Sequence, residues 1–188
     1  MRKPVETTEP IHQVLAERWS PRSFEHGAEI SQNDLTGLLE AARWAPSANN
    51  LQPWKFAVAK HGEARFDAIA DSLTGFNKEW APKASAFIVA FAEVLNPDGT
   101  SRSTALYDLG LSVGFLSVEA QHRGLVTHQM AGFDRETLSA HFGATEALLP
   151  IVVIAVGKQA ASSALTTDVL REREESPRSR KPIAEITL

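Results

Sequence analysis

The sequence has no cysteine among its 188 residues. This absence excludes a disulfide framework, a thiol nucleophile, a zinc site with cysteine ligands and an iron–sulfur cluster. Without a redox-active thiol, any oxidation or reduction that this chain performs must come from a bound cofactor.

Basic residues are outnumbered by acidic ones, since 19 Lys and Arg stand against 23 Asp and Glu, for a net charge of -4 and a pI near 5.9. Nucleic-acid-binding proteins need an excess of Lys and Arg to displace counterions from phosphates. We therefore expect no nucleic-acid partner.

Long apolar runs are also missing, because no stretch of the sequence approaches the length of a membrane span. Residues 1–9 are polar and of mixed charge, without the apolar centre of a signal peptide. These features predict no membrane partner and a cytoplasmic location.

Several common enzyme motifs do not occur. The sequence contains no Gly-x-Gly-x-x-Gly after an expected strand, no phosphate-binding Gly-Lys-Ser/Thr loop and no Gly-x-Ser-x-Gly elbow. Its six histidines show no paired spacing that suggests a metal. No side-chain acid–base pair stands out either, which fits a protein whose chemistry is supplied by a cofactor.

The composition otherwise suits an ordinary globular protein, with 43% hydrophobic and 22% charged residues. Hydrophobic periodicity predicts both helices and strands. Helices are expected after Pro10 with Thr8 as cap, after the capping box of Ser31 and Asp34, and around residues 66–73, 104–123 and 134–142. Strands are expected at residues 55–59, 86–92, 126–130 and 151–157, with turns at residues 75–82. The length leaves room for one domain or one protomer of an obligate dimer.

The stretch from Arg43 to Phe56, R-W-A-P-S-A-N-N-L-Q-P-W-K-F, cannot be helix or strand throughout. Pro46 and Pro53 each remove a backbone donor and disfavour helical geometry in the residue before them. Between them stand the uncharged polar residues Ser47, Asn49, Asn50 and Gln52. Because such side chains both donate and accept hydrogen bonds, they suit the edge of a neutral planar heterocycle. The alternative is a solvated turn.

Arg18, Ser20 and Arg22 form a second polar element. Guanidinium groups pair with phosphate oxygens through two parallel hydrogen bonds, so arginines on either side of a serine could converge on one phosphate. The alternative is a pair of exposed arginines at a helix end.

Gly110 and Gly114 lie inside the helix expected at residues 104–123, where each lowers helix propensity by roughly 1 kcal/mol relative to alanine. The side chains expected to face inward are Leu106, Leu109, Val113, Leu116 and Ala120. Glycines one turn apart indicate close approach of another helix. That helix could belong to a partner chain or to the same chain.

The pattern of Pro46, Ser47, Asn50, Gln52, Pro53 and Trp54 resembles the FMN-binding loop of the nitroreductase family. Three further elements match the family in order along the chain: Arg18-x-Ser20-x-Arg22, the run Gly132-Phe133-Asp134, and the basic residues Arg178 and Arg180 ahead of Pro182. The sequence departs from the family at Trp19, where a basic residue is frequent, and at Ala131, where a more polar or smaller residue is usual.

The resemblance implies an α+β fold, a nitroreductase-like three-layer sandwich with a central, mostly antiparallel sheet flanked by helices. It also implies a domain-entwined homodimer. Residues 1–188 would form a single domain, in which residues 158–188 are a C-terminal extension that contributes to the FMN site and the dimer. The helix with two glycines and the C-terminal tail carry more apolar surface than one small domain can easily cover, which supports a dimer.

By the same resemblance, the FMN-binding residues are Arg18, Trp19, Ser20, Arg22, Pro46, Ser47, Asn50, Gln52, Asn77, Ala131, Gly132, Arg178 and Arg180. The backbone amide of Gly132 would face N5 and O4 of the flavin and act in catalysis. A glycine there lets the N–H approach a ligand without a side chain in between. No metal is implied.

The implied activity is an FMN-dependent oxidoreductase that uses NADPH or NADH to reduce nitroaromatic, quinone or related electron-poor small molecules by a ping-pong mechanism. Other flavin chemistry on the same fold is an alternative: dehydrogenation, dehalogenation or flavin breakdown. A non-catalytic flavin-binding module and an interaction domain without a cofactor are two more.

Overall fold

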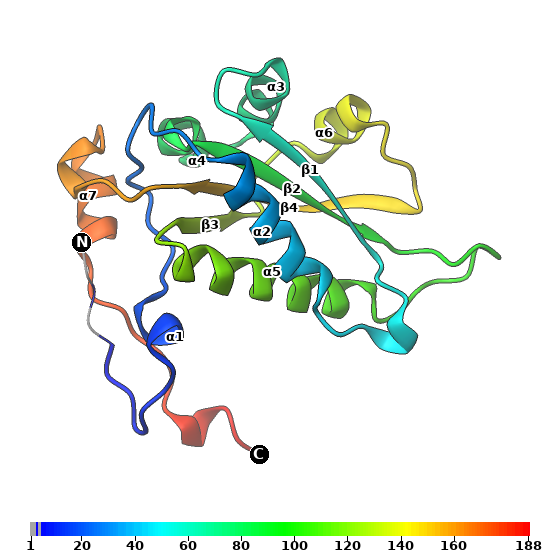
Figure 1. Cartoon of the computed structure of the whole chain (residues 1–188), viewed down its shortest axis with the longest axis horizontal. Coiled ribbons are helices and arrows are strands. Elements are labelled where there is room, and N and C mark those ends of the chain that lie inside the picture. Colours follow the sequence, from blue (N-terminus) through cyan, green and yellow to red (C-terminus); the bar gives the residue numbers. More distant parts are fainter. Residues whose placement is uncertain (1–2, 4) are drawn as a thin grey trace.

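An antiparallel sheet forms the middle layer of the structure, a computed structural model that describes residues 3 and 5–188 (Figure 1). In the described part of the chain the sheet has four strands in the order β1-β2-β4-β3. The strands are β1 (Trp54–Lys60), β2 (Ala86–Glu93), β3 (Val126–Met130) and β4 (Leu148–Gly157). Each expected strand is present, although β4 begins at Leu148 rather than at residue 151.

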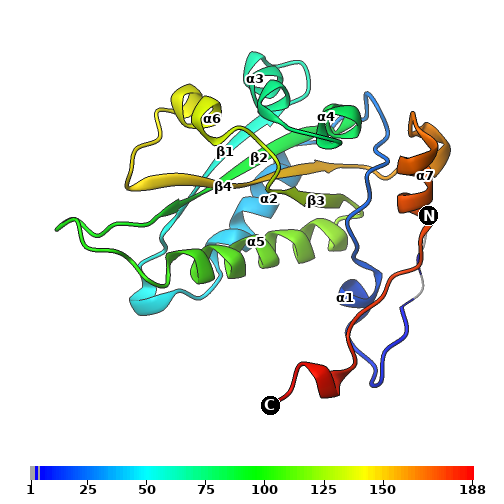
Figure 2. The same cartoon turned by 180° about the vertical axis from the view of Figure 1, so that it is seen from behind.

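Helices cover both faces of this sheet. Their bounds are α1 (Gln13–Glu17), α2 (Gln32–Arg43), α3 (Ala64–Ser72), α4 (Asn77–Trp80), α5 (Ala105–His122), α6 (Arg135–Phe142) and α7 (Asp168–Glu175). α2 and α5 lie on one face, and α3, α4 and α6 lie on the other (Figures 1 and 2). The predicted α+β three-layer sandwich with a central antiparallel sheet is confirmed.

β2 and β4 occupy the centre of the sheet because they are apolar on both faces. Every residue of β2 from Ala86 to Ala92 is buried, as a strand covered on two sides requires. The register of the β2–β4 ladder shifts between Ala90 and Phe91, next to the pairing of Phe91 with Pro150. Proline has no N–H to donate, so the irregularity falls where a ladder hydrogen bond could not form.

The two faces of the sheet carry separate apolar clusters. Ile88 joins the cluster under α2 and α5, whereas its neighbour Phe87 joins the cluster under α3 and α6. Phe66 of α3 stacks on Phe87 with ring centroids 4.4 Å apart. The hydroxyl of Ser112 donates to the carbonyl of Ala42 at 2.8 Å and ties α5 to α2. Both faces are therefore covered, which leaves the ends of the sheet and the edge strand β3 for a site.

α1 begins later than expected. The Nδ1 atom of His12 accepts a hydrogen bond from the N–H of Val14 at 3.3 Å, so His12 caps the helix. The expected cap was wrong, because Thr8 lies in an irregular segment too far ahead of the first turn to reach it. Ile11 and Leu15 are 49% and 47% exposed, so this part of the chain leaves apolar side chains uncovered.

α5 has an apolar side that no described part of the chain covers. Leu106 was wrongly expected to face inward and is 56% exposed, while Tyr107 and Phe115 are 70% and 44% exposed. A Cβ atom built on Gly110 or Gly114 meets no described atom within 4 Å, which contradicts packing against a helix of the same chain. The other inward residues are as predicted: Leu109, Val113, Leu116 and Ala120. We call Leu106, Tyr107, Gly110, Gly114 and Phe115 the open face of α5.

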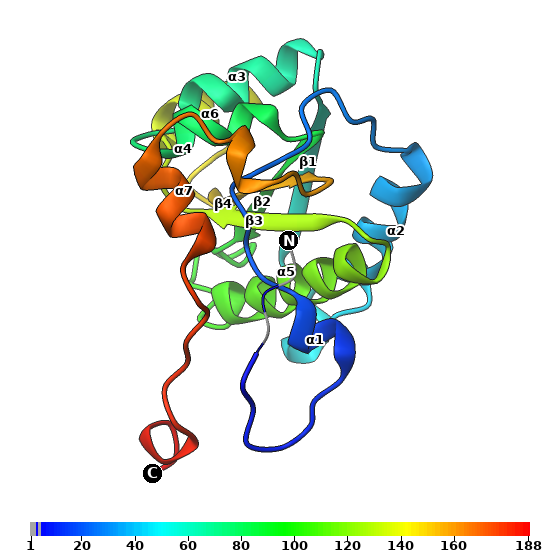
Figure 3. The same cartoon turned by 90° about the vertical axis from the view of Figure 1, so that its left-hand side faces the viewer.

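The N-terminal segment and the C-terminal tail extend from the sandwich in the same direction (Figure 3). The Nζ atom of Lys3 donates to the carbonyl of Ser176 at 2.7 Å, which joins them near the body. Further along the tail, Ile183 and Ile186 are 58% and 70% exposed. None of the helices in the described residues is long and apolar enough to cross a membrane.

Candidate functional site

Four arginines from the two ends of the chain carry the predicted phosphate site. Burial lowers the pKa of Arg18, and the charges of Arg178 and Arg180 lower it further. Burial also lowers the pKa of Arg22, against the opposing charge of Glu174. None of the four forms an ion pair with a carboxylate of the described residues. Guanidinium groups stay charged at physiological pH, so Arg18, Arg178 and Arg180 repel one another, and a bound anion would offset this repulsion.

The segment after α1 carries two of these arginines and a serine. A guanidinium nitrogen of Arg18, Nη1, donates to Oγ of Ser20 at 3.4 Å, and Arg22 is half-buried nearby. Trp19 differs, since it is only 9% exposed and lies under the Nζ atom of Lys3, 4.1 Å from its ring centroid. Any contact of Trp19 with a cofactor is therefore left to its backbone.

Two residues outside the predicted set hold this segment in place. The carboxylate of Glu174, 1% exposed, accepts hydrogen bonds from the N–H groups of Arg22 at 2.8 Å and Ser23 at 3.2 Å. The Nδ1 atom of His128 lies 2.9 Å from the carbonyl oxygen of Pro21. Because a carbonyl only accepts, Nδ1 must carry the proton in this bond.

The C-terminal tail returns to the same segment. The guanidinium group of Arg178 donates to the carbonyls of Ala16 at 2.5 Å and Arg18 at 2.8 Å. Arg180 bonds only to the carbonyl of its neighbour Ser179, at 2.7 Å. Part of Arg178 is thus used to hold the backbone, whereas the exposed guanidinium group of Arg180 keeps most of its donors for a ligand.

The loop after β3 places Gly132 in close contact with Thr74 and Asn77. The carbonyl of Gly132 accepts from the N–H of Thr74 at 3.0 Å and from Nδ2 of Asn77 at 3.1 Å. A Cβ atom on Gly132 would come within 2.9 Å of that same nitrogen. No described residue accepts a hydrogen bond from the N–H of Gly132, which therefore has its donor free for a ligand. Ala131, beside it, is exposed.

The polar loop that precedes β1 has an unusual backbone. Asn49, Asn50 and Gln52 have φ angles of 50°, 54° and 50°, and they are the described residues other than glycine with positive φ. Such left-handed residues store roughly 1–3 kcal/mol each and occur often at functional sites. The N–H of Gln52 donates to Oγ of Ser47 at 3.0 Å, and its side-chain amide donates to the carbonyl of Asn50 at 3.1 Å. These bonds hold the strained conformation.

The polar loop and the arginine segment lie at opposite ends of α5, apart from the Asn77–Gly132 contact after β3. The N–H of Ala48 donates to the buried Asp108 at 3.3 Å, which fixes the polar loop near the start of that helix. The segment from Arg18 to Arg22 lies beside the other end of α5, as both views show (Figures 1 and 2). One chain therefore does not bring the predicted ring-edge loop to the predicted phosphate residues.

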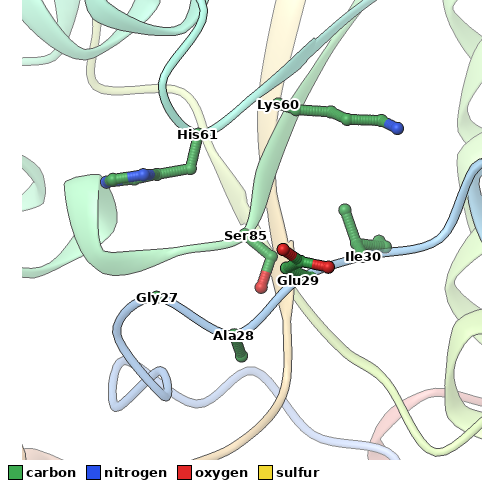
Figure 4. Close-up of a pocket in the computed structure, with 7 residues that line it drawn as sticks. All are labelled: Gly27, Ala28, Glu29, Ile30, Lys60, His61 and Ser85. Atoms are coloured by element: carbon green, nitrogen blue, oxygen red, sulfur yellow. The ribbon is translucent and has the colours of Figure 1, made fainter.

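Two cavities differ in their relation to these groups. The larger, about 460 Å³, lies where β1 ends and is lined by Lys60, His61, Ser85 and the turn at residues 27–30 (Figure 4). It contains none of the predicted cofactor residues. The smaller, about 250 Å³, is lined partly by Pro46 and Ser47 and borders the open face of α5. The polar loop thus has a cavity beside it, next to uncovered apolar surface.

Comparisons with known proteins agree with these features. A family model described as "Nitroreductase family" matches residues 15–97. An "Uncharacterized 15.4 kDa protein in ask 5'region" of Mycolicibacterium smegmatis is 33% identical over 139 residues, which cover 70% of this chain and 92% of that protein. The chain belongs to the nitroreductase family.

Two other relatives cover most of the chain. The "Putative NAD(P)H nitroreductase YdgI" of Bacillus subtilis (strain 168) is 27% identical over 206 residues, covering 88% of this nitroreductase-family chain and 98% of that protein. A solved structure described as "The crystal structure of the oxidoreductase containing FMN" has a TM-score of 0.91 at 28% identity, over 97% of this chain and 93% of that one. The resemblance to nitroreductases inferred from the sequence is confirmed.

Glu174 was missed because residues 171–175 alternate in charge, a pattern typical of a solvated helix. The signal that could have found it is spacing, since Glu174 lies one turn after Leu170, which is fully buried. His128 gave no comparable signal. A lone histidine in a strand is usually a core or surface residue, and only the fold brings it to Pro21.

The pKa of His128 predicts a loss of stability in mild acid. Burial lowers it from 6.5 to about 4, so the unfolded chain binds this proton more readily than the folded protein. The stability that neutral His128 contributes to the folded protein is therefore fully present above the pKa of 6.5 that the residue has in the unfolded chain. This stability is lost as the pH falls toward 4. We expect this residue to lower the free energy of unfolding by about 2 kcal/mol between pH 7 and pH 5.

Urea unfolding of the wild type and the variants His128→Gln and His122→Gln at both pH values measures this effect. His128→Gln should lose that part of the pH dependence, whereas replacement of the exposed His122 should keep it. Equal pH dependence in all three proteins would contradict the prediction.

Proposed function

We propose that this chain is an FMN-dependent oxidoreductase that uses NADPH or NADH to reduce small electron-poor acceptors such as nitroaromatics and quinones. The observation that carries the proposal is the cluster of Arg18, Arg178 and Arg180, with Arg22 on the same segment as Arg18, none of them in an ion pair with a described carboxylate. A phosphate dianion would offset their mutual repulsion. The relative "Major NAD(P)H-flavin oxidoreductase" of Aliivibrio fischeri, 34% identical over 91 residues, supports both the cofactor and the electron donor.

The chain's own groups suit the remaining parts of FMN. Ser20 would add a hydroxyl beside the phosphate and the ribityl chain. Ser47, Asn50 and Gln52 would contact the ribityl hydroxyls and the edge of the ring with uncharged donors and acceptors. The free N–H of Gly132 would donate toward N5 and O4 and favour negative charge there.

Bound flavin would supply the hydride chemistry, which protein side chains cannot perform. The protein would bind the nicotinamide and then the acceptor over the same ring, in a ping-pong cycle. Because the acceptor needs only to stack on that ring, several classes of electron-poor compound could be reduced. A cytoplasmic location agrees with the use of a reduced nicotinamide.

The site is completed, in this proposal, by a second copy of the chain. The polar loop and the arginine cluster lie at opposite ends of α5, so one FMN cannot contact both within a single chain. The open face of α5 and the exposed Ile183 and Ile186 of the tail offer apolar surface for a partner. We propose a domain-entwined homodimer to which residues 158–188 contribute.

The absorbance spectrum of the purified protein, before and after anaerobic addition of NADPH or NADH, tests the function. We expect flavin bands at about 370 and about 450 nm that bleach with one of the two donors. Colourless protein that takes up no added FMN would overturn the proposal. Flavin bands that neither donor bleaches would instead favour other flavin chemistry or a non-catalytic flavin-binding module.

The double variant Arg22→Ala/Arg180→Ala tests the phosphate assignment. Both side chains lack carboxylate partners, so their loss should leave the fold intact and raise the Kd for FMN by roughly 100-fold or more, because each charge-assisted hydrogen bond contributes about 1.5–3 kcal/mol. Arg65→Ala/Arg135→Ala removes the same charge from exposed helix positions outside the cluster. Flavin content per protomer measures the difference, and full occupancy in the first variant would refute the assignment.

Gly114→Glu tests the dimer. A side chain at Gly114 meets nothing within the described protomer, and glutamate favours helix more than glycine does, so the protomer should fold. A buried, unpaired charge at the proposed interface should produce monomers with lowered FMN content. Sedimentation measures the mass, and Ala140→Glu on the exposed side of α6 is the matched control. A Gly114→Glu protein that remains dimeric would show that the open face of α5 is not the interface.

A further inference from the structure

Glu174 is a buried carboxylate that bonds to the backbone of the predicted phosphate segment. It is 1% exposed and accepts from the consecutive N–H groups of Arg22 and Ser23, at 2.8 and 3.2 Å. It forms no ion pair with a described basic residue. A buried charge requires hydrogen bonds to offset the loss of water, and here the backbone supplies them.

This bonding keeps the arginines available. A carboxylate that paired directly with Arg18 or Arg22 would compete with a phosphate for the same guanidinium donors. Glu174 is directed instead at the amides of Arg22 and Ser23, although its charge still acts on Arg22 and opposes the lowering of that residue's pKa by burial. It can therefore reduce repulsion in the basic cluster without occupying the donors.

We propose that Glu174 is a positioning residue for the flavin phosphate, which makes Arg18, Ser20 and Arg22 converge on it and gives the protein its preference for FMN over riboflavin. This inference rests on the proposed FMN-dependent function. Nothing in the resemblance or the sequence pattern pointed to this residue. Its location on α7 also makes the phosphate segment depend on the C-terminal extension.

The variant Glu174→Gln tests the proposal with little change of shape. Its amide oxygen can accept one of the two N–H groups, but its NH₂ group must face the other donor. Glu172→Gln is the matched control, because Glu172 is exposed on the same helix and its side chain forms no hydrogen bond with a described residue. Dissociation constants for FMN and for riboflavin are measured by flavin fluorescence on the full-length protein.

We expect Glu174→Gln to weaken FMN binding by roughly 10- to 100-fold, the effect of losing one hydrogen bond to a charged group. Riboflavin binding should change by less than about threefold, because riboflavin has no phosphate for the segment to hold. Glu172→Gln should match the wild type for both ligands. Equal losses for FMN and riboflavin would show a merely structural role and overturn the proposal, as would unchanged FMN binding.

A second measurement covers the case in which Glu174→Gln does not fold. Amide hydrogen exchange in the wild-type protein should be slow at Arg22 and Ser23, because both N–H groups are bonded to a buried acceptor. Exchange at the rate of a free loop amide would overturn the proposal. Glu174→Asp keeps the charge on a shorter side chain and should retain more of the preference for FMN than Glu174→Gln does.

The outcomes separate this inference from the function on which it rests. Wild-type protein that binds neither FMN nor riboflavin would refute the proposed function and the positioning role together. Wild-type protein that binds FMN while Glu174→Gln binds it equally well would refute the positioning role alone, and the proposed function would stand.

Discussion

The segment from Arg18 to Ser23 has no helix or strand of its own to satisfy its backbone, and the candidate site depends on how that need is met. Glu174 accepts from two of its N–H groups, while Arg178 and His128 donate to carbonyls in or next to it. These three side chains come from α7, the tail and β3. The proposed anion site therefore forms only when the rest of the chain has folded around this segment.

Positive charge is concentrated at the proposed phosphate site, although the chain as a whole is acidic. The chain as a whole carries a net charge of -4, yet Arg18, Arg178 and Arg180 lie close together where the tail returns to the N-terminal segment. Local positive charge in an acidic protein would direct an anion to one place. The single buried carboxylate beside these arginines lowers their repulsion but leaves their guanidinium donors free, because its oxygens accept from backbone amides.

Sequence alone predicted the parts whose causes are local. The capping box of Ser31 lies within one helical turn, and β2 is apolar along its whole buried length, so both were predictable. The errors have non-local causes. Leu106 faces outward because no described element covers that side of α5, and Glu174 is buried because α7 docks against a segment distant in sequence. The separation of the site into two groups depends on the fold and could not be read from motif order.

α5 connects the core, the polar loop and the proposed partner. Its inner side is buried against the sheet, its first turns hold the polar loop through Asp108, and its open face carries Gly110 and Gly114, which let another backbone approach closely. In a dimer whose two-fold axis is perpendicular to α5, the same face meets itself with the helices antiparallel. The start of one α5 would then lie near the end of the other, and the polar loop of one chain near the arginines of its partner. The two groups that a single chain keeps apart would be joined by the contact that covers the open face.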